Sequence, residues 1–192
     1  MTGRFEEATL VRKKAIELDF LSPVINTDIG LTLYFARKYD EAIEQFKKTL
    51  EIDPTFVLAY APLAGAYEQK KMNNDAIVAL STLTASLSYA SVSHPIPIAA
   101  LGHAYALAGR TDDALSMLEL VEEMSATQYV APYWRGVLAV GLGRKPEALA
   151  WLEKAFEEHD GSMVFLKVDP VFDSIRAEPR FVRLLKKMRL SD

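Results

Sequence analysis

A set of three residues recurs four times along the chain, and its spacing limits what the chain can fold into. In each set an alanine is followed four positions later by a large apolar residue and seven positions later by a smaller or aliphatic one. The sets are Ala42, Phe46 and Thr49; Ala76, Leu80 and Leu83; Ala114, Leu118 and Val121; and Ala148, Leu152 and Ala155. The alanine moves by 34, 38 and 34 residues. Repeats of this length predict a stacked array, because each unit buries its apolar face only against its neighbours.

A second pattern shifts by the same steps in the half-unit before each alanine. It consists of Ile29-Gly30, Leu63-Ala64, Leu101-Gly102 and Arg135-Gly136, followed three residues later by Leu33, Tyr67, Tyr105 and Ala139. Each unit is therefore predicted to be one helical hairpin. We expect Gly30 to lie opposite Ala42, where its missing side chain lets the two helices approach closely.

The 192 residues are predicted to form a single domain, because a repeat array grows by addition. The expected units are a half repeat at 3–22, repeats at 23–56, 57–94 with an insertion, 95–128 and 129–160, and a C-terminal cap at 161–192. Residues 3–8 resemble residues 37–42, so the chain begins with a lone second helix that runs to about residue 18. Either the chain is the end of a longer protein, or this helix is a natural cap.

Proline and glycine give the expected helix limits. The first complete hairpin has helices at 23–36 and 39–52, and Asp53-Pro54 ends the second one. Pro62 predicts a helix that starts late or bends. Residues 86–94 are either a longer loop or an overrun of the preceding helix. Thr111 is the expected N-cap of its helix, and the last hairpin is expected at 129–142 and 145–158, joined by Gly143.

The last residues combine an apolar stripe with positive charge. Phe181, Leu184, Leu185 and Met188 follow helical spacing and are expected to cover the last hairpin. Residues 176–192 carry a charge of +4, which leaves −8 for the rest of a chain whose total is −4. Such a patch could touch nucleic acid, but a solvated helix face explains it better, and we expect no nucleic-acid binding by this domain.

Arg135 stands where the other units have Ile or Leu. A charge at an apolar position needs a carboxylate partner, an opening to a groove or a slipped helix. We favour a local pairing over ligand recognition.

No catalytic or metal site is predicted. The chain has no cysteine, and His94, His103 and His159 share no metal-binding spacing. No glycine-rich loop resembles a phosphate cradle, so no cofactor is expected. No apolar run reaches eighteen residues, so no membrane insertion is expected. A cytoplasmic location is expected, subject to whatever precedes Met1.

The repeated Leu-Gly, Tyr and Ala positions, closed by Asp53-Pro54, resemble the tetratricopeptide repeat over residues 3–158. The tryptophan of that pattern is replaced by Asn26, Tyr60, Ile98 and Pro132. The resemblance implies an all-α fold, a right-handed α-α superhelix of antiparallel hairpins (a TPR solenoid) with a C-terminal capping helix. The segment 166–181 resembles the end of tetratricopeptide regions in bacterial multidomain regulators, where such regions accompany a winged-helix domain, a nucleotide cyclase or a Ser/Thr kinase.

In that family the first helices line a concave groove that binds proteins or peptides. Carried onto this chain, the lining residues are Thr27, Leu31, Tyr34, Ala61, Gly65, Glu68, Ala99, His103, Ala106, Tyr133, Val137 and Val140. The Lys, Asn and Arg that grip a chaperone's terminal carboxylate are absent at these positions. The resemblance therefore implies a non-catalytic scaffold for an extended peptide or an amphipathic helix.

Two alternatives stay open at this point. Tyr34, Tyr133 and Trp134 either anchor a partner or pack between hairpins. The chain could also self-assemble into a homodimer through residues 5–18.

Overall fold

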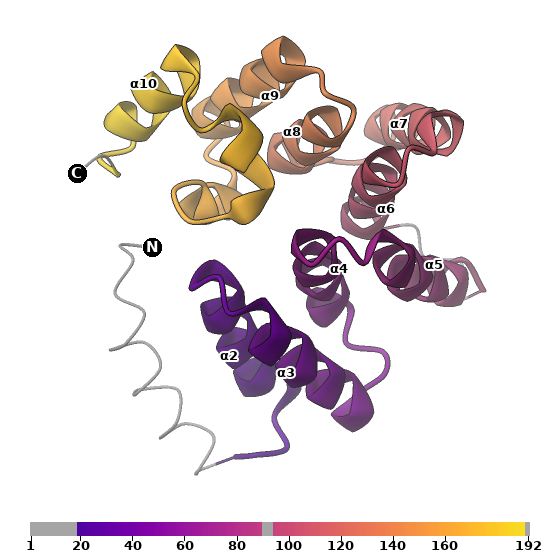
Figure 1. The fold of residues 1–192 in the computed structure, drawn as a ribbon. Coiled ribbons are helices and arrows are strands. Elements are labelled where there is room, and N and C mark those ends of the chain that lie inside the picture. Colours follow the sequence, from indigo (N-terminus) through magenta and orange to yellow (C-terminus); the bar gives the residue numbers. More distant parts are fainter. Residues whose placement is uncertain (1–18, 90–93, 191–192) are drawn as a thin grey trace. The chain divides into compact units, whose positions relative to one another are not determined.

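The computed structural model describes residues 19–89 and 94–190, which belong to two compact units. Residues 19–89 are called the first unit below, and residues 94–190 the second unit. Within these residues every regular element is a helix (Figure 1), which confirms the predicted all-α class. The helix predicted for residues 3–18 lies outside the described residues, and the single domain stays a prediction.

The first unit contains two helical hairpins. Its elements are α2 (Pro23–Phe35), α3 (Tyr39–Ile52), the short 3-10 helix η1 (Val57–Ala59), α4 (Tyr60–Gln69) and α5 (Asn73–Tyr89). α2 packs on α3, α3 on α4 and α4 on α5. Ser22 caps α2 by accepting a hydrogen bond from the Ile25 N–H, and Asp53 adopts the extended backbone that a following proline favours.

The second unit contains two further hairpins and a C-terminal cap. The hairpin helices are α6 (Pro95–Leu107), α7 (Thr111–Ser125), α8 (Pro132–Gly141) and α9 (Lys145–Glu157). The cap consists of the 3-10 helices η2 (Gly161–Phe165) and η3 (Pro170–Ile175) and of α10 (Pro179–Lys187). η3 packs against α8, and α10 against α9.

The recurring alanines form the centre of the hairpins. All four are fully buried: Ala42, Ala76, Ala114 and Ala148. Gly30 lies at a close approach between helices, where a Cβ atom would overlap with the ring of Phe46 on α3. That Ala42 lies opposite this glycine stays a prediction.

The four hairpin turns share one geometry. A residue with left-handed backbone stands at the same place in each: Arg37, Lys71, Gly109 and Gly143, with φ of 65°, 64°, 75° and 70°. The next backbone N–H then donates to a carbonyl five residues earlier, at 2.9 Å in every turn. The four accepting residues are Leu33, Tyr67, Tyr105 and Ala139. This is the six-to-one hydrogen bond of the Schellman motif, and it explains why the two halves of each unit shift together in sequence.

Three helix starts or ends refine the predictions. α4 begins at Tyr60, which places Pro62 in the first turn, so the predicted late start is confirmed. α5 runs to Tyr89, which confirms the overrun for residues 86–89. α8 begins at Pro132 and not at residue 129, because proline is favoured in a first turn and the preceding residue is driven out of the helical region.

The predicted N-cap of α7 is wrong. The cap residue is Arg110, and Thr111 is the first helical residue with no capping role. The cause is the shared turn: Lys38, Arg110 and Arg144 follow the left-handed residue directly and have φ and ψ of −90° and 68°, −86° and 67°, and −83° and 62°.

Arg135 has the predicted local partner. Its Nη2 lies 2.9 Å from Glu122 Oε2, and the guanidinium carbon lies 4.3 Å from the centre of the Trp151 ring. The residue is only 8% exposed. A carboxylate from α7 and an aromatic face from α9 therefore accommodate the charge at this apolar position.

The predicted apolar stripe of α10 faces the hairpins. Phe181 and Leu184 are buried in a core cluster with Leu152, Leu166 and Phe172, and Leu185 and Met188 pack at its edge. α10 is therefore a lid on the second unit.

Candidate functional site

The twelve residues of the predicted groove lie on the first helices of the hairpins, α2, α4, α6 and α8. Seven of them are buried: Thr27, Tyr34, Glu68, Ala99, His103, Tyr133 and Val137. Five keep part of their surface exposed: Leu31, Ala61, Gly65, Ala106 and Val140. All five exposed positions are small or apolar.

In the first unit, two of the predicted lining residues, Tyr34 and Gly65, lie against each other. A Cβ atom at Gly65 would lie 2.8 Å from the hydroxyl oxygen of Tyr34. The Tyr34 ring also lies 5.3 Å from the ring of Phe35 and 6.0 Å from that of Tyr39. Tyr34 thus packs between helices here.

In the second unit, Tyr133 holds the C-terminal cap. Its hydroxyl donates to Asp169 Oδ2 at 2.6 Å, and its backbone N–H donates to Asp160 Oδ2 at 3.0 Å. Its ring meets Phe172 edge to face, with the centres 5.2 Å apart. Since Tyr133 is 2% exposed, its contact surface is used by the cap itself. His103 is buried against Gly141, where an added Cβ atom would lie 2.8 Å from the imidazole.

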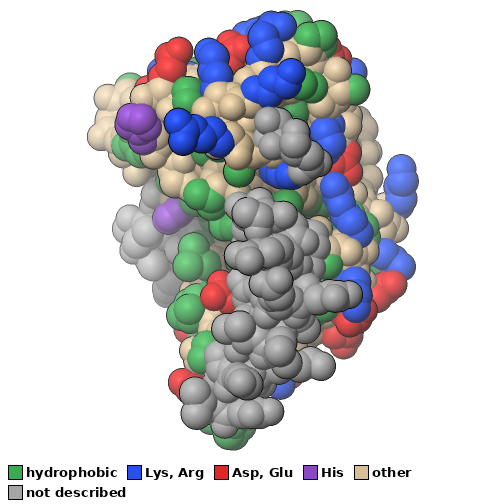
Figure 2. Space-filling view, turned by 90° about the vertical axis from the view of Figure 1, so that its left-hand side faces the viewer, with side chains coloured by type: hydrophobic (Ala, Val, Ile, Leu, Met, Phe, Trp, Pro, Cys, Tyr) green, Lys and Arg blue, Asp and Glu red, His purple; other side chains and the backbone are tan. Residues whose placement is uncertain are grey.

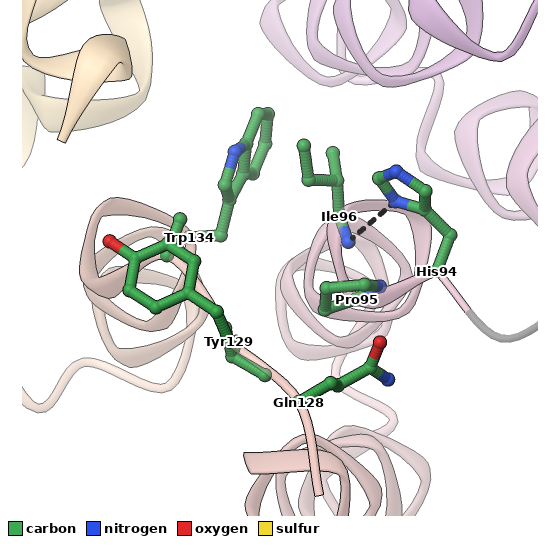
Figure 3. A pocket seen from close by; sticks show the side chains of 8 residues that line it. His94, Pro95, Ile96, Gln128, Tyr129 and Trp134 are labelled. Atoms are coloured by element: carbon green, nitrogen blue, oxygen red, sulfur yellow. Dashed lines mark hydrogen bonds between the residues drawn. The ribbon is translucent and has the colours of Figure 1, made fainter.

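A pocket that the sequence reasoning missed lies at the N-terminal ends of α6 and α8. It has a volume of about 300 Å³ and is lined by His94, Pro95, Ile96, Gln128, Tyr129, Val130, Ala131 and Trp134. Figure 3 shows the indole of Trp134 on one side and Ile96 with Pro95 on the other, and the ring of Tyr129 beside Trp134. The His94 Nδ1 accepts a hydrogen bond from the Ile96 N–H at 3.4 Å, which caps α6 and fixes one wall of the pocket.

A sequence signal for this edge existed. Val24, Leu58, Ile96 and Val130 are apolar and are separated by 34, 38 and 34 residues, the same steps as the core alanines. Val24 and Leu58 are 56% and 64% exposed in the first unit, whereas Ile96 and Val130 line the pocket in the second unit. An apolar row with the repeat period therefore marked the N-terminal edge of the first helices.

Two carboxylates lie near the Tyr129 side of the pocket, those of Asp160 and Glu158. Partial burial raises the pKa of the Tyr129 hydroxyl, and the carboxylates of Asp160 and Glu158 raise it further. The negative charge on this side of the pocket disfavours a phenolate and favours a cation.

Positive charge gathers instead on the cap. In the face of the molecule that Figure 2 shows, Lys and Arg side chains gather in the upper part, where α10 lies. Arg180 is paired there through two hydrogen bonds to Glu153, at 3.1 Å and 2.7 Å. The Arg180 hydrogen bonds, its charge, and the charges of Lys187 and Arg183 lower the pKa of the Glu153 carboxyl. The basic residues thus hold the cap on α9 at one point and are solvated at others, such as Arg183 and Lys186.

Two further searches concern only the part of the chain that the structure describes. No three His, Asp or Glu side chains there gather closely enough to hold a metal ion. None of the helices there has the length and apolar character that crossing a bilayer requires.

Comparison with known proteins shows which family has this architecture. Tetratricopeptide repeat family profiles match residues 35–87 and residues 99–119 and 130–154, which together are just over half of the chain. No curated protein matches the sequence. Among solved structures, MamA has a TM-score of 0.56 and 25% identity, over 83% of this chain and 91% of MamA.

Two further structures, with lower sequence identity, share the fold. YrrB, described as a TPR protein with an unusual peptide-binding site, has a TM-score of 0.51 and 19% identity, over 92% of this chain and 89% of YrrB. A chain of the APC/C Cut9-Hcn1 hetero-tetramer has a TM-score of 0.60 and 18% identity, over 98% of this chain and 37% of that one. With the repeated hairpins and the family matches, these similarities lead to one conclusion: the chain belongs to the tetratricopeptide repeat family.

Proposed function

We propose that this chain is a non-catalytic scaffold that binds a segment of a partner protein, as a peptide or an amphipathic helix, on the surface of its first helices. One observation carries the proposal: the predicted lining positions that remain accessible are all small or apolar. They are Leu31, Ala61, Gly65, Ala106 and Val140. Small or apolar side chains at these positions let a partner bury apolar residues against them without leaving an unpaired charge.

Two further points support a binding role. Tetratricopeptide repeat proteins are generally interaction scaffolds, and YrrB, which shares the fold, is described as having a peptide-binding site. The stacked hairpins also present their first helices as repeated, similar surfaces, which suits an extended partner.

Selection of random twelve-residue peptides displayed on phage tests the proposal with the full chain as bait. We expect enriched peptides that bind in calorimetry with micromolar Kd. Leu31→Glu and Val140→Glu each change one accessible residue of a first helix. At least one of these two variants should bind the peptide at least tenfold more weakly. Gly65→Arg is a poorer choice, because a side chain there would displace Tyr34.

Val78→Glu is the matched control, since Val78 is 64% exposed on the second helix α5. It should leave binding unchanged, and circular dichroism should show equal helicity for all variants. A chain that enriches no peptide, or peptides that bind all three variants equally, would reject the first-helix surface as the binding site.

The larger setting is also a proposal. We infer that the chain serves a larger bacterial regulatory protein, because segment 166–181 resembles the end of tetratricopeptide regions in such proteins. The reading frame of the parent gene decides this, since a winged-helix, cyclase or kinase domain should precede the repeats.

Self-assembly is the second candidate function. Phe20, Leu21 and Val24 are each more than half exposed, and large apolar side chains on a surface favour association. Sedimentation velocity at several concentrations should then show a dimer that Leu21→Glu with Val24→Glu abolishes. A monomer at all concentrations would reject this candidate.

A further inference from the structure

The pocket between α6 and α8 is a concave site on the first-helix surface and lies within a single unit. Trp134 and Tyr129 supply aromatic surface on one side, and Pro95 and Ile96 aliphatic surface on the other. Its volume of about 300 Å³ is at the lower end of the range for small-molecule sites, which is about 300–1,000 Å³. A pocket of this size and lining suits one large apolar side chain.

The walls of the pocket are held in place from beneath. Val130 is buried in a core cluster with Ile98, Val121 and Leu138, so the floor is part of the hydrophobic core. The hydrogen bond from the Ile96 N–H to His94 fixes the start of α6. A preformed pocket costs less ordering entropy on binding than one that a partner must open.

Negative charge lies at the Tyr129 side of the pocket. Beyond α8, the carboxylates of Asp160 and Glu158 add to the effect of partial burial in raising the pKa of the Tyr129 hydroxyl. Lys154 lies 3.6 Å from Glu158, but both side chains are more than one third exposed, so this pair screens the negative charge only in part.

We propose that this pocket binds one large apolar side chain, Leu, Phe or Met, from a peptide segment whose neighbouring residues are Lys or Arg. The apolar side chain inserts between Trp134 and Ile96, and the basic neighbours lie against the carboxylates of Asp160 and Glu158. The inference rests on the proposed function, since it names the site and the peptide chemistry within the binding role.

The test uses three synthetic peptides with the isotope-labelled full chain in NMR titrations. The first has a central Phe between two Lys on each side, the second has Glu in place of each Lys, and the third has Ser in place of Phe. The chain has two tryptophans, so two indole N–H signals report directly, and Trp151→Phe assigns the signal of Trp134. We expect the first peptide to shift the Trp134 indole signal and the amide signals of Ile96 and of residues 128–131.

The affinities should follow the chemistry of the pocket. The first peptide should bind at least tenfold more tightly than either of the other two. Ile96→Glu and Ala131→Trp, which charges or fills the pocket, should each weaken its binding at least tenfold. Glu158→Lys should reduce the preference for the Lys peptide over the Glu peptide.

The possible failures separate the two proposals. If phage display enriches peptides that lose binding in Leu31→Glu or Val140→Glu but not in Ile96→Glu or Ala131→Trp, the scaffold function holds and the pocket inference is overturned. If no peptide is enriched and the Lys peptide shifts no signal, both fall. Pocket signals that move with the concentration of the chain itself, and not with peptide, would assign the pocket to a second copy and overturn the inference.

Discussion

The hydroxyl of Tyr133 lies 2.6 Å from a carboxylate oxygen of Asp169, and this hydrogen bond joins the last repeat to the C-terminal cap. Tyr133 belongs to the first helix of the last repeat, where the resemblance placed a partner-binding residue. In this structure the cap contacts that side chain, through Asp169 and the ring of Phe172. The cap therefore covers α8 in the way that a further repeat would.

Tyr133→Phe should destabilise the second unit by about 2 kcal/mol, because a hydrogen bond to a charged acceptor contributes about 1.5–3 kcal/mol. Urea denaturation followed by circular dichroism measures the change. Tyr105→Phe is the matched control, because the Tyr105 hydroxyl makes no hydrogen bond within the described residues. Equal stability of the two variants would show that the cap is held by apolar contacts alone.

At the turn residues with left-handed backbone, introducing glycine and removing glycine should change stability in opposite directions. Lys71 has φ of 64°, which costs an L-residue about 1 kcal/mol, so Lys71→Gly should stabilise the chain by up to that amount. Gly143 has φ of 70°, and Gly143→Ala should destabilise it by about 1 kcal/mol. Thermal melts of both variants check this. A lower melting temperature for Lys71→Gly would mean that the turn does not keep this backbone in solution.

Two substitutions in the Arg135–Glu122 pair should have different effects on stability, because one leaves a buried charge without its partner and the other removes that charge. Glu122→Ala should destabilise the second unit by about 3 kcal/mol, because it leaves a charge that is 8% exposed without its carboxylate. Arg135→Leu restores the residue type of the earlier repeats and should be neutral or stabilising. Denaturant titrations of the two variants and of the double variant give the coupling. A larger loss for Arg135→Leu than for Glu122→Ala contradicts the prediction.

The Arg180 pair makes the second unit sensitive to acid. The hydrogen bonds of Arg180 lower the pKa of Glu153 in the folded state, so this pair stabilises the cap above the ordinary carboxyl pKa of about 4.5. The contribution is lost as the pH falls below that value through the lowered pKa. Melting temperatures between pH 7 and pH 3 should therefore fall less steeply for Glu153→Gln than for the natural chain.

Glu119→Gln serves as the control for that series, since Glu119 is exposed and has no ion pair within residues 94–190. Its melting temperatures should follow those of the natural chain. Identical pH curves for all three proteins would show that the Glu153–Arg180 pair does not contribute to the acid sensitivity of the second unit.

The sequence predicted the parts of the fold that repeat. Ala42 and its three counterparts predicted the buried centre of each hairpin, because small residues at a fixed period are needed where helices touch. Arg135 predicted a local carboxylate, because a charge at a buried position needs one. These inferences depend on spacing and burial, which a single chain records directly.

The sequence did not predict features that depend on three-dimensional contacts between different elements. Thr111 has the chemistry of an N-cap, but the repeated turn already places Arg110 at that position. Tyr133 has the spacing of a lining residue, yet η3, which lies outside the repeats, covers it. The pocket at Trp134 forms because the α7–α8 connection meets the start of α6, and no local pattern fixes the path of a connection.

One experiment decides whether the first helices are the working surface of this protein. It is a map of amide chemical-shift changes across the full chain when a peptide enriched by phage display is added. We expect the changes to concentrate on α2, α4, α6 and α8 and on the residues at their N-terminal ends. Changes concentrated on α3, α5, α7 and α9 would contradict this, because they would place the partner on the opposite side of every hairpin.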